Sequence, residues 1–298
     1  MSTTHSVYVV AGPIGLGRLD ERSREKLKHA QLAAGSDRVA PAARLAEHLG
    51  LAPTLLNRAA TRYRGECGRT VKGWIAAADP VYLEPRLDHL CLMSQDVDDE
   101  EREALLNHLN AVFVDDGLRF VIEGRGLYLQ AETPIASSSY PTSLIDGLLP
   151  NKYLPSGDGV DDFRTRLAEI EMSLHEHPLN QARQSRGQKP INSLWLWGGG
   201  VAEAVVPQSL PPLYSGDALL RGLWSLHGSA PRDRDDDPAI DDGPCVLDIG
   251  DDLTVVTELL ERGRSMLLFS RDGLTLDASG SGRWRFWARR HAELEPPA

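Results

Sequence analysis

The sequence predicts an α/β protein in which a parallel or mixed sheet is flanked by helices. Apolar runs at residues 5–11 and 191–197 have the composition of buried strands, and each leaves through a glycine-rich turn. Polar stretches rich in alanine and leucine between residues 20 and 63 are typical of helices that cover a sheet. The chain has 298 residues, of which 41% are hydrophobic, so it can form one large core or two smaller ones.

A different pattern begins at Trp74. The following segment contains paired strands at residues 74–85 and 89–93, an amphipathic helix with an acidic start at 98–116, and a hairpin at 118–132. This order of elements predicts a small α+β lobe. We therefore expect a lobe of residues 74–155, inserted into a discontinuous core of residues 1–73 and 156–298.

The second part of the predicted core continues the α/β pattern. The segment 161–177 is expected to be a long helix with Phe163, Ile170 and Leu174 on one face, and Pro178 follows it. The apolar run that ends at residue 197 has the continuous composition of a buried parallel strand. The C-terminal part adds a strand at 245–249, a helix at 253–263 and a strand at 265–270.

Composition narrows the class of protein. The formal net charge of −11 argues against a nucleic-acid binder, because such proteins neutralise phosphates with basic surfaces. The three cysteines (Cys67, Cys91 and Cys245) fit neither a disulfide framework nor a zinc site, which favours a reducing compartment. No signal-peptide pattern or long apolar run is present. We therefore predict a cytoplasmic protein with neither nucleic acid nor membrane among its partners.

Two short motifs invite functional interpretation. Gly12, Gly15 and Gly17 follow the first strand, but their spacing matches neither common phosphate-binding fingerprint, so a tight turn and an anion site both stay open. His175 and His177 are two residues apart, which on a helix places their side chains about 200° apart. They cannot share one metal ion there, and a capping or surface role is expected.

Charged and glycine-rich segments give the remaining indications of a partner or a binding site. The acidic run 230–243 lacks the ligand spacing of a calcium loop and is predicted to be a solvated linker. This linker and the aromatic-basic run 283–290 are the only hints of a protein partner. In open α/β sheets ligands bind at the carboxyl ends of strands, so Gly198–Gly200, directly after an apolar strand, is the best indication of a binding site.

Residues 177–200, with the sequence HPLNQARQSRGQKPINSLWLWGGG, resemble a segment of the archaeal-type cofactor-independent phosphoglycerate mutases. That segment has His-Pro-Val-Asn, an arginine three residues on, and an asparagine before a Trp-Leu-Trp-Gly strand end. The order of elements from residue 74 to residue 228 is also similar. The resemblance implies an alkaline-phosphatase-like fold. It further implies ligand-binding roles for Asn180, Arg183, Asn192, Trp197 and Gly198, with Arg183 as the anion contact.

The chain departs from this family where the family holds its metals. Mutases of this type use two metal ions and a serine that carries the phosphoryl group. Here Pro13 stands where the resemblance places a metal-binding aspartate, no Gly-Ser-Asp nucleophile segment precedes Trp74, and His291 is the only histidine after His227. We therefore predict no metal site, no cofactor and no catalytic residue.

Two functions remain as hypotheses. The favoured one is a catalytically degenerate, mutase-like pseudoenzyme that binds a phosphorylated small molecule and acts as a regulatory protein. The alternative is an active, metal-dependent phosphoglycerate mutase or a related phosphotransferase. Fold analogy alone does not decide whether the chain is an enzyme.

Overall fold

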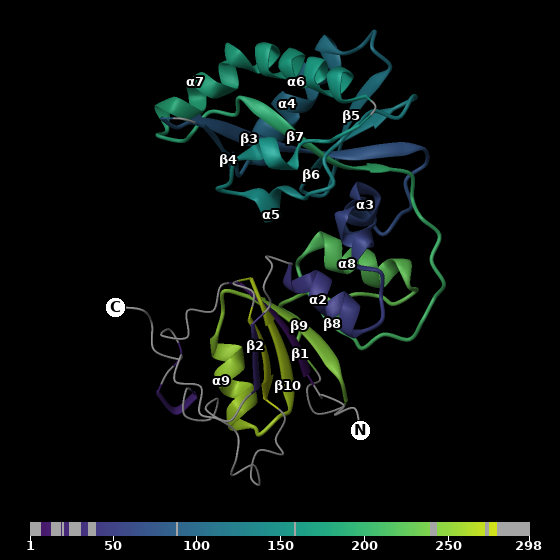
Figure 1. Cartoon of the computed structure of the whole chain (residues 1–298), viewed down its shortest axis with the longest axis vertical. Helices are drawn as coiled ribbons and strands as arrows, with labels where there is room; N and C mark the ends of the chain where they lie inside the picture. Colours follow the sequence, from purple (N-terminus) through teal and green to yellow (C-terminus); the bar gives the residue numbers. More distant parts are fainter. Residues whose placement is uncertain are drawn as a thin grey trace. The chain divides into compact units, whose positions relative to one another are not determined.

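Figure 1 shows the chain as a computed structural model, which describes residues 7–12, 19, 21–23, 31–34, 40–87, 89–157, 159–238, 243–271 and 274–278. The chain divides into two compact units. Unit 1 comprises Met1–Pro53 and Val206–Ala298, and unit 2 comprises Thr54–Val205. Among the described residues, none of the helices has both the length and the apolar character that crossing a bilayer requires.

Unit 1 is built on a six-stranded sheet with the order β2-β11-β10-β1-β9-β8. Its strands are β1 (Val7–Ala11), β2 (Gln31–Ala34), β8 (Leu213–Tyr214), β9 (Cys245–Gly250), β10 (Met266–Ser270) and β11 (Leu274–Ala278). Strand β1 runs parallel to both β9 and β10, whereas β11 is antiparallel to β10 and to β2. The predicted mixed α/β sheet is therefore confirmed.

Helices cover both faces of this sheet. The described helices of unit 1 are α2 (Pro41–His48), α8 (Ala218–Leu226) and α9 (Thr254–Glu261). Val7 and Val9 of β1 pack in one buried cluster with Val256 of α9. Tyr8 points the other way, where its ring centroid lies 5.5 Å from that of His48 on α2. Successive side chains of a strand point to opposite faces, so β1 is buried on both sides, as its apolar run predicted.

One predicted helix is partly wrong. Residues 31–34, expected to be helical, form strand β2, which pairs with β11 so that Gln31 lies opposite Asp277. Helix propensities differ by about 0.7 kcal/mol or less among ordinary residues, so pairing along a sheet edge can override them. The predictions for Gly15, Gly17, residues 241–242 and the basic run 283–290 concern parts of the chain outside the described residues.

Unit 2 contains an antiparallel five-stranded sheet. Its strands are β3 (Trp74–Pro85), β4 (Leu90–Ser94), β5 (Leu118–Glu123), β6 (Gly126–Ala131) and β7 (Ser193–Gly200). The long strand β3 pairs with β7 along one edge and with β6 and then β4 along the other, while β5 pairs with β6. The helical segments are η2 (Pro53–Asn57), α3 (Ala59–Cys67), α4 (Asp99–Val112), α5 (Thr142–Ile145), η3 (Pro150–Tyr153), α6 (Val160–His175) and α7 (Pro178–Ser185).

The predicted direction of strand β7 is wrong. It was expected to be parallel, but it is antiparallel to β3, with Trp197 opposite Ala77. Its continuous apolar run reflects burial on both faces: Leu194 and Leu196 pack in the cluster below α4 and α6, while Trp197 lies under Arg62 of α3. The two compact units divide at 53/54 and 205/206, and the lobe of residues 74–155 within a discontinuous core stays a prediction.

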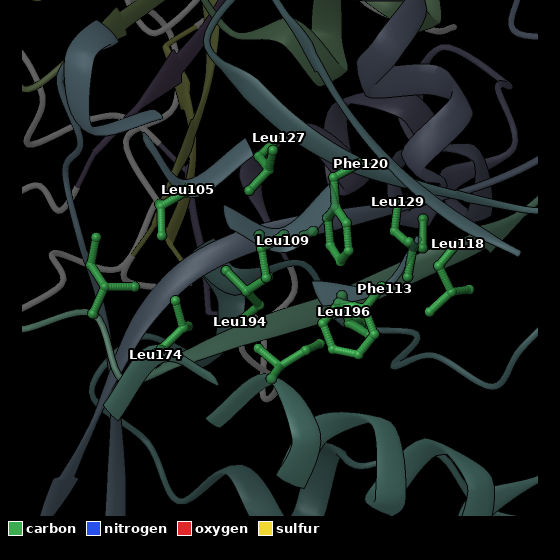
Figure 2. Close-up of a cluster of buried hydrophobic side chains, with 14 of the residues drawn as sticks. Leu105, Leu109, Phe113, Leu118, Phe120, Leu127, Leu129, Leu174, Leu194 and Leu196 are labelled. Carbon is green, nitrogen blue, oxygen red and sulfur yellow. The ribbon is translucent and has the colours of Figure 1, made fainter. Parts of the chain in front are cut away.

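The core of unit 2 is a layer of leucine and phenylalanine side chains between helices and sheet. Figure 2 shows Leu105 and Leu109 of α4, and Phe113 at the C-cap of this helix, in one buried cluster with Phe120 of β5 and Leu129 of β6. Helix α4 begins with a capping box, in which Asp98 Oδ1 accepts the N–H of Glu101 at 2.8 Å. The predicted acidic helix start is thus confirmed.

Candidate functional site

Strand β7 ends in three glycines, of which Gly198 has a backbone conformation that favours glycine. Its φ is 68°, and its N–H donates to the carbonyl oxygen of Ser138 at 2.8 Å. A Cβ atom here would lie 2.6 Å from the backbone nitrogen of Ala59 and 2.8 Å from the carbonyl oxygen of Asn57. Glycine therefore lets the end of β7 lie directly against the first turn of α3.

The next two glycines lie beside polar side chains. Gly199 donates its N–H to Ser137 Oγ at 2.9 Å. At Gly200 a Cβ would have Arg58 Nη1 as its nearest neighbour, at 3.7 Å, which leaves room beside the guanidinium. Arg58 forms a 3.0 Å ion pair with Glu203, and the two side chains are 43% and 44% exposed. The strand end thus combines small residues, a hydroxyl group and an accessible cation.

A charge network holds the adjoining part of β7. The carboxylate of Asp79 on β3 accepts hydrogen bonds from Trp197 Nε1 at 2.7 Å and Thr142 Oγ1 at 2.5 Å, and it is ion-paired with Arg62. The guanidinium of Arg62 lies over the rings of Tyr128 and Trp197, 5.2 and 5.8 Å from their centroids. Burial is the largest influence on the pKa of Arg62 and lowers it, but the charge and hydrogen bond of Asp79, together with Tyr128 and Glu66, raise the pKa overall, so Arg62 stays charged.

Asn180 is buried at the start of α7, where it satisfies backbone groups of two other segments. Its Nδ2 donates to the carbonyl oxygens of Leu174 and Ile191 at 2.9 and 2.8 Å, and its Oδ1 accepts the N–H of Ile191 at 2.7 Å. The amide therefore ties α6, α7 and the segment before β7 together. The predicted ligand-binding role of Asn180 stays a prediction, and the structure gives this side chain a bracing role.

Arg183 is also used internally. Its guanidinium donates to Glu101 Oε2 at 2.7 Å, to the carbonyl oxygens of Lys189 and Asp96 at 2.7 and 3.0 Å, and to Gln95 Oε1 at 3.1 Å. The side chain is only 3% exposed. An anion would have to displace these acceptors, so the contacts of Arg183 favour a structural role over the predicted anion contact.

Asn192 extends the pairing of β7 with β3 by one residue. Its Oδ1 accepts the N–H of Leu83 at 2.7 Å and its Nδ2 donates to the carbonyl oxygen of Leu83 at 3.1 Å, so the side-chain amide imitates a backbone partner. Of the five predicted residues, Trp197 and Gly198 lie together at the strand end. Asn180, Arg183 and Asn192 lie in the surrounding scaffold.

Sequence reasoning missed Arg58, Arg62 and Asp79. Asp79 follows three buried alanines within β3, and a carboxylate inside such an apolar run is a signal for a buried charge partner. The partner Arg62 could not be identified, because nothing in the spacing shows that α3 packs over β7. Arg58 belongs to no motif and becomes notable only through its place beside Gly200.

Within the residues that the structure describes, no group of three or more His, Cys, Asp or Glu side chains is arranged to hold a metal ion. At the end of β1, Gly12 donates its N–H to the carbonyl oxygen of Gly250 at 2.7 Å, and Asp251 lies against it. This amide, part of the possible anion site, is therefore engaged by the protein itself.

No protein-family model matches the chain. It is 31% identical over 140 residues, or 44% of this chain, to the 2,3-bisphosphoglycerate-independent phosphoglycerate mutase of Methanosarcina barkeri. It is 28% identical over 115 residues, or 36% of this chain, to the enzyme of the same name from Methanosarcina mazei. Over part of its length, the chain is related to these mutases. The predicted resemblance is thereby confirmed. The matches span 35% and 28% of the two relatives, so the chain covers about a third of their length.

Two solved structures are similar to the chain in backbone. One is a cofactor-independent phosphoglycerate mutase from Thermoplasma acidophilum, with 15% identity and a TM-score of 0.41 over 92% of this chain and 89% of the other. The second is a protein from Pyrococcus horikoshii, with 12% identity and a TM-score of 0.46 over 92% of this chain and 85% of the other.

Proposed function

We propose that this mutase-like protein binds a phosphorylated small molecule at the end of β7 and acts as a regulatory protein without mutase turnover. The observation that carries the proposal is the position of Arg58. Its guanidinium lies beside the open backbone of Gly200, where it is accessible to solvent. Arginine is well suited to phosphate, because its planar set of N–H donors matches the geometry of phosphate oxygens.

The partner of Arg58 supports an anion at this place. The Glu203 carboxylate lies 3.0 Å from Arg58 Nε, in a half-exposed pair that contributes little to stability. A carboxylate and a phosphate offer similar oxygen acceptors. A phosphorylated ligand could therefore replace Glu203 without leaving a buried charge unpaired. The Ser137 hydroxyl, which lies beside Gly199, adds a second polar group to the same strand end.

The absence of turnover is proposed from the sequence. Phosphoryl transfer through two metal ions requires several carboxylates and imidazoles that converge from distant segments. In the sequence, Pro13 occupies the position where the resemblance places a metal-binding aspartate, no Gly-Ser-Asp segment precedes Trp74, and His291 is the only histidine after His227. A protein that keeps a ligand site but lacks this constellation acts through binding.

Isothermal titration of the full chain with 3-phosphoglycerate, and separately with inorganic phosphate, tests the proposal. Hydrogen bonds to charged groups contribute about 1.5–3 kcal/mol, so Arg58→Ala should weaken binding roughly 10- to 100-fold. Arg64→Ala, on helix α3, which Arg58 precedes as the N-cap residue, is the matched control and should bind like the unaltered chain. Glu203→Gln should tighten binding, because it removes the competing carboxylate. Absence of saturable binding, or unchanged binding by Arg58→Ala, would contradict the proposal.

Active catalysis remains the second candidate, and the sequence relation to mutases favours it. A coupled assay of 3- to 2-phosphoglycerate conversion, with and without manganese, distinguishes the two functions. The binding proposal expects no conversion above background in either condition. Manganese-dependent turnover that Arg58→Ala abolishes would establish the catalytic alternative.

A further inference from the structure

Two imidazole rings meet where three helices of unit 2 come together. His108 lies on α4, and His177 lies between α6 and α7; their ring centroids are 4.4 Å apart, with the planes at 71°. His108 Nε2 lies 2.9 Å from the carbonyl oxygen of Ser173 near the end of α6. A carbonyl oxygen only accepts, so this nitrogen carries a proton. A protonated His108 would keep this bond and would place a positive charge beside His177.

His177 is the N-cap residue of α7. Its Nδ1 accepts the N–H of Leu179 at 3.2 Å, which requires an unprotonated nitrogen at that position. An imidazolium carries N–H groups on both nitrogens, so protonation removes this cap. The resulting cation would also lie at the N-terminus of α7, where the helix dipole disfavours positive charge. Burial lowers the pKa of His177, and the charge of His108 lowers it further.

The charged groups on the packed helices do not neutralise a cation at His177. On α4, Glu101 is ion-paired with Arg183 of α7. On α6, Glu171 accepts a hydrogen bond from the first residue of β7. His175 and Glu176, at the end of α6, are exposed. Among the described ionisable groups, His108 is the one whose charge acts on the pKa of His177.

We propose that the contact between His108 and His177 is a proton-operated release for α7, which stays closed at neutral pH and opens locally under mildly acidic conditions. Helix α7 has only eight residues, so it depends strongly on its cap and its tertiary contacts. It carries Asn180 and Arg183, which bind α4, α6 and the segment before β7. Opening would therefore expose buried polar groups at this junction while the sheet of unit 2 stays intact. This inference does not depend on the proposed ligand.

Hydrogen exchange followed by mass spectrometry of the full chain tests the release. Protection factors for residues 178–186, corrected for the intrinsic effect of pH, are compared at about pH 7.5 and about pH 5.5, a range that spans histidine titration. Loss of an N-cap should lower protection about fivefold at the lower pH. Peptides from β3 and β7 should keep their protection. His177→Asn supplies a cap that does not titrate and should abolish the response, whereas His175→Asn, in the same segment, should retain it.

The release is refuted by equal protection of residues 178–186 at both pH values in the unaltered chain. It is equally refuted if His177→Asn keeps the full response. Should that variant fail to fold, His108→Phe preserves a ring contact but removes the neighbouring charge. Because the charge of His108 lowers the pKa of His177, its removal raises this pKa, so the loss of protection should become smaller and its midpoint should move to higher pH. An unchanged response would overturn the role of the pair.

Discussion

Replacing Glu101 with glutamine isolates the effect of one buried charge on unit 2. Glu101 occupies the third position of α4 and accepts hydrogen bonds from Arg183 and Arg186. The side chains of Glu101 and Arg183 are 5% and 3% exposed. Glutamine can keep the capping box with Asp98, so the substitution removes mainly the charge.

The magnitude follows from the burial of the partner. Removing one member of a buried ion pair costs about 3–5 kcal/mol, because the remaining charge is left uncompensated. Arg183 retains acceptors in Asp96, Lys189 and Gln95, so we expect a loss near the lower end, about 3 kcal/mol. Arg183→Met alone should cost a similar amount. The double variant should lose less than the sum, with a coupling of about 1–3 kcal/mol.

The assay must report on unit 2 separately, because a chain of two compact units does not unfold in one two-state step. Hydrogen exchange of β3 and β7 peptides in increasing urea gives the free energy of unfolding for this sheet. Arg164→Gln removes an exposed ion pair with Asp161 and should cause no measurable change. A loss below about 0.5 kcal/mol for Glu101→Gln, or strictly additive single effects, would refute the reasoning.

Three further outcomes test the packing and the charges of unit 2. Gly198→Ala should cost about 3 kcal/mol in the same exchange assay, since the backbone clash adds to a left-handed φ, whereas Gly187→Ala, with a similar φ but open space, should cost about 1 kcal/mol. Phe113→Ala should lower the free energy of unfolding of unit 2 by about 3–5 kcal/mol through loss of buried contacts, measured by the same exchange assay in urea. Burial raises the pKa of Glu171, so the folded state binds its proton more tightly than the unfolded state does. The neutral carboxyl group of Glu171 therefore stabilises the folded state at low pH, and this stabilisation is lost as the pH rises through the pKa of Glu171 in the folded state. Glu171→Gln should consequently raise the thermal midpoint of unfolding near pH 7 and change it little near pH 4.

Local sequence patterns predicted most elements of unit 2. Helix α4 has an acidic start, a capping box and leucines at helical spacing, and each of these features acts within one turn or two. The hairpin of β5 and β6 is likewise local, since Gly124 at its turn has a φ of 54°. The direction of β7 is a tertiary property, because apolar composition reports burial on both faces and not the orientation of the neighbouring strand.

The residues of the candidate site also differ in how far the sequence alone could reveal them. The glycines after β7 could be singled out, because a triplet following an apolar run is visible in the sequence. Arg58 and Asp79 could not, since their importance arises from contacts across more than a hundred residues, as between Asp79 and Trp197. The buried bonds of Asn180 and Arg183 were equally hidden, because a motif shows which residues occur together and not which of them face a ligand.

The difference between a buried structural contact and an exposed ligand contact decides which substitution can identify the function. Arg183 carries part of the resemblance to the mutases, but it holds α7 against Glu101 through buried hydrogen bonds. Its removal would abolish any activity by loosening the fold, so that loss of function in Arg183→Ala would say nothing about ligand contact. Arg58 is half exposed and paired only weakly, so its removal should leave the fold unchanged. A loss of phosphate binding in Arg58→Ala, with unchanged stability, can therefore be attributed to the ligand contact itself.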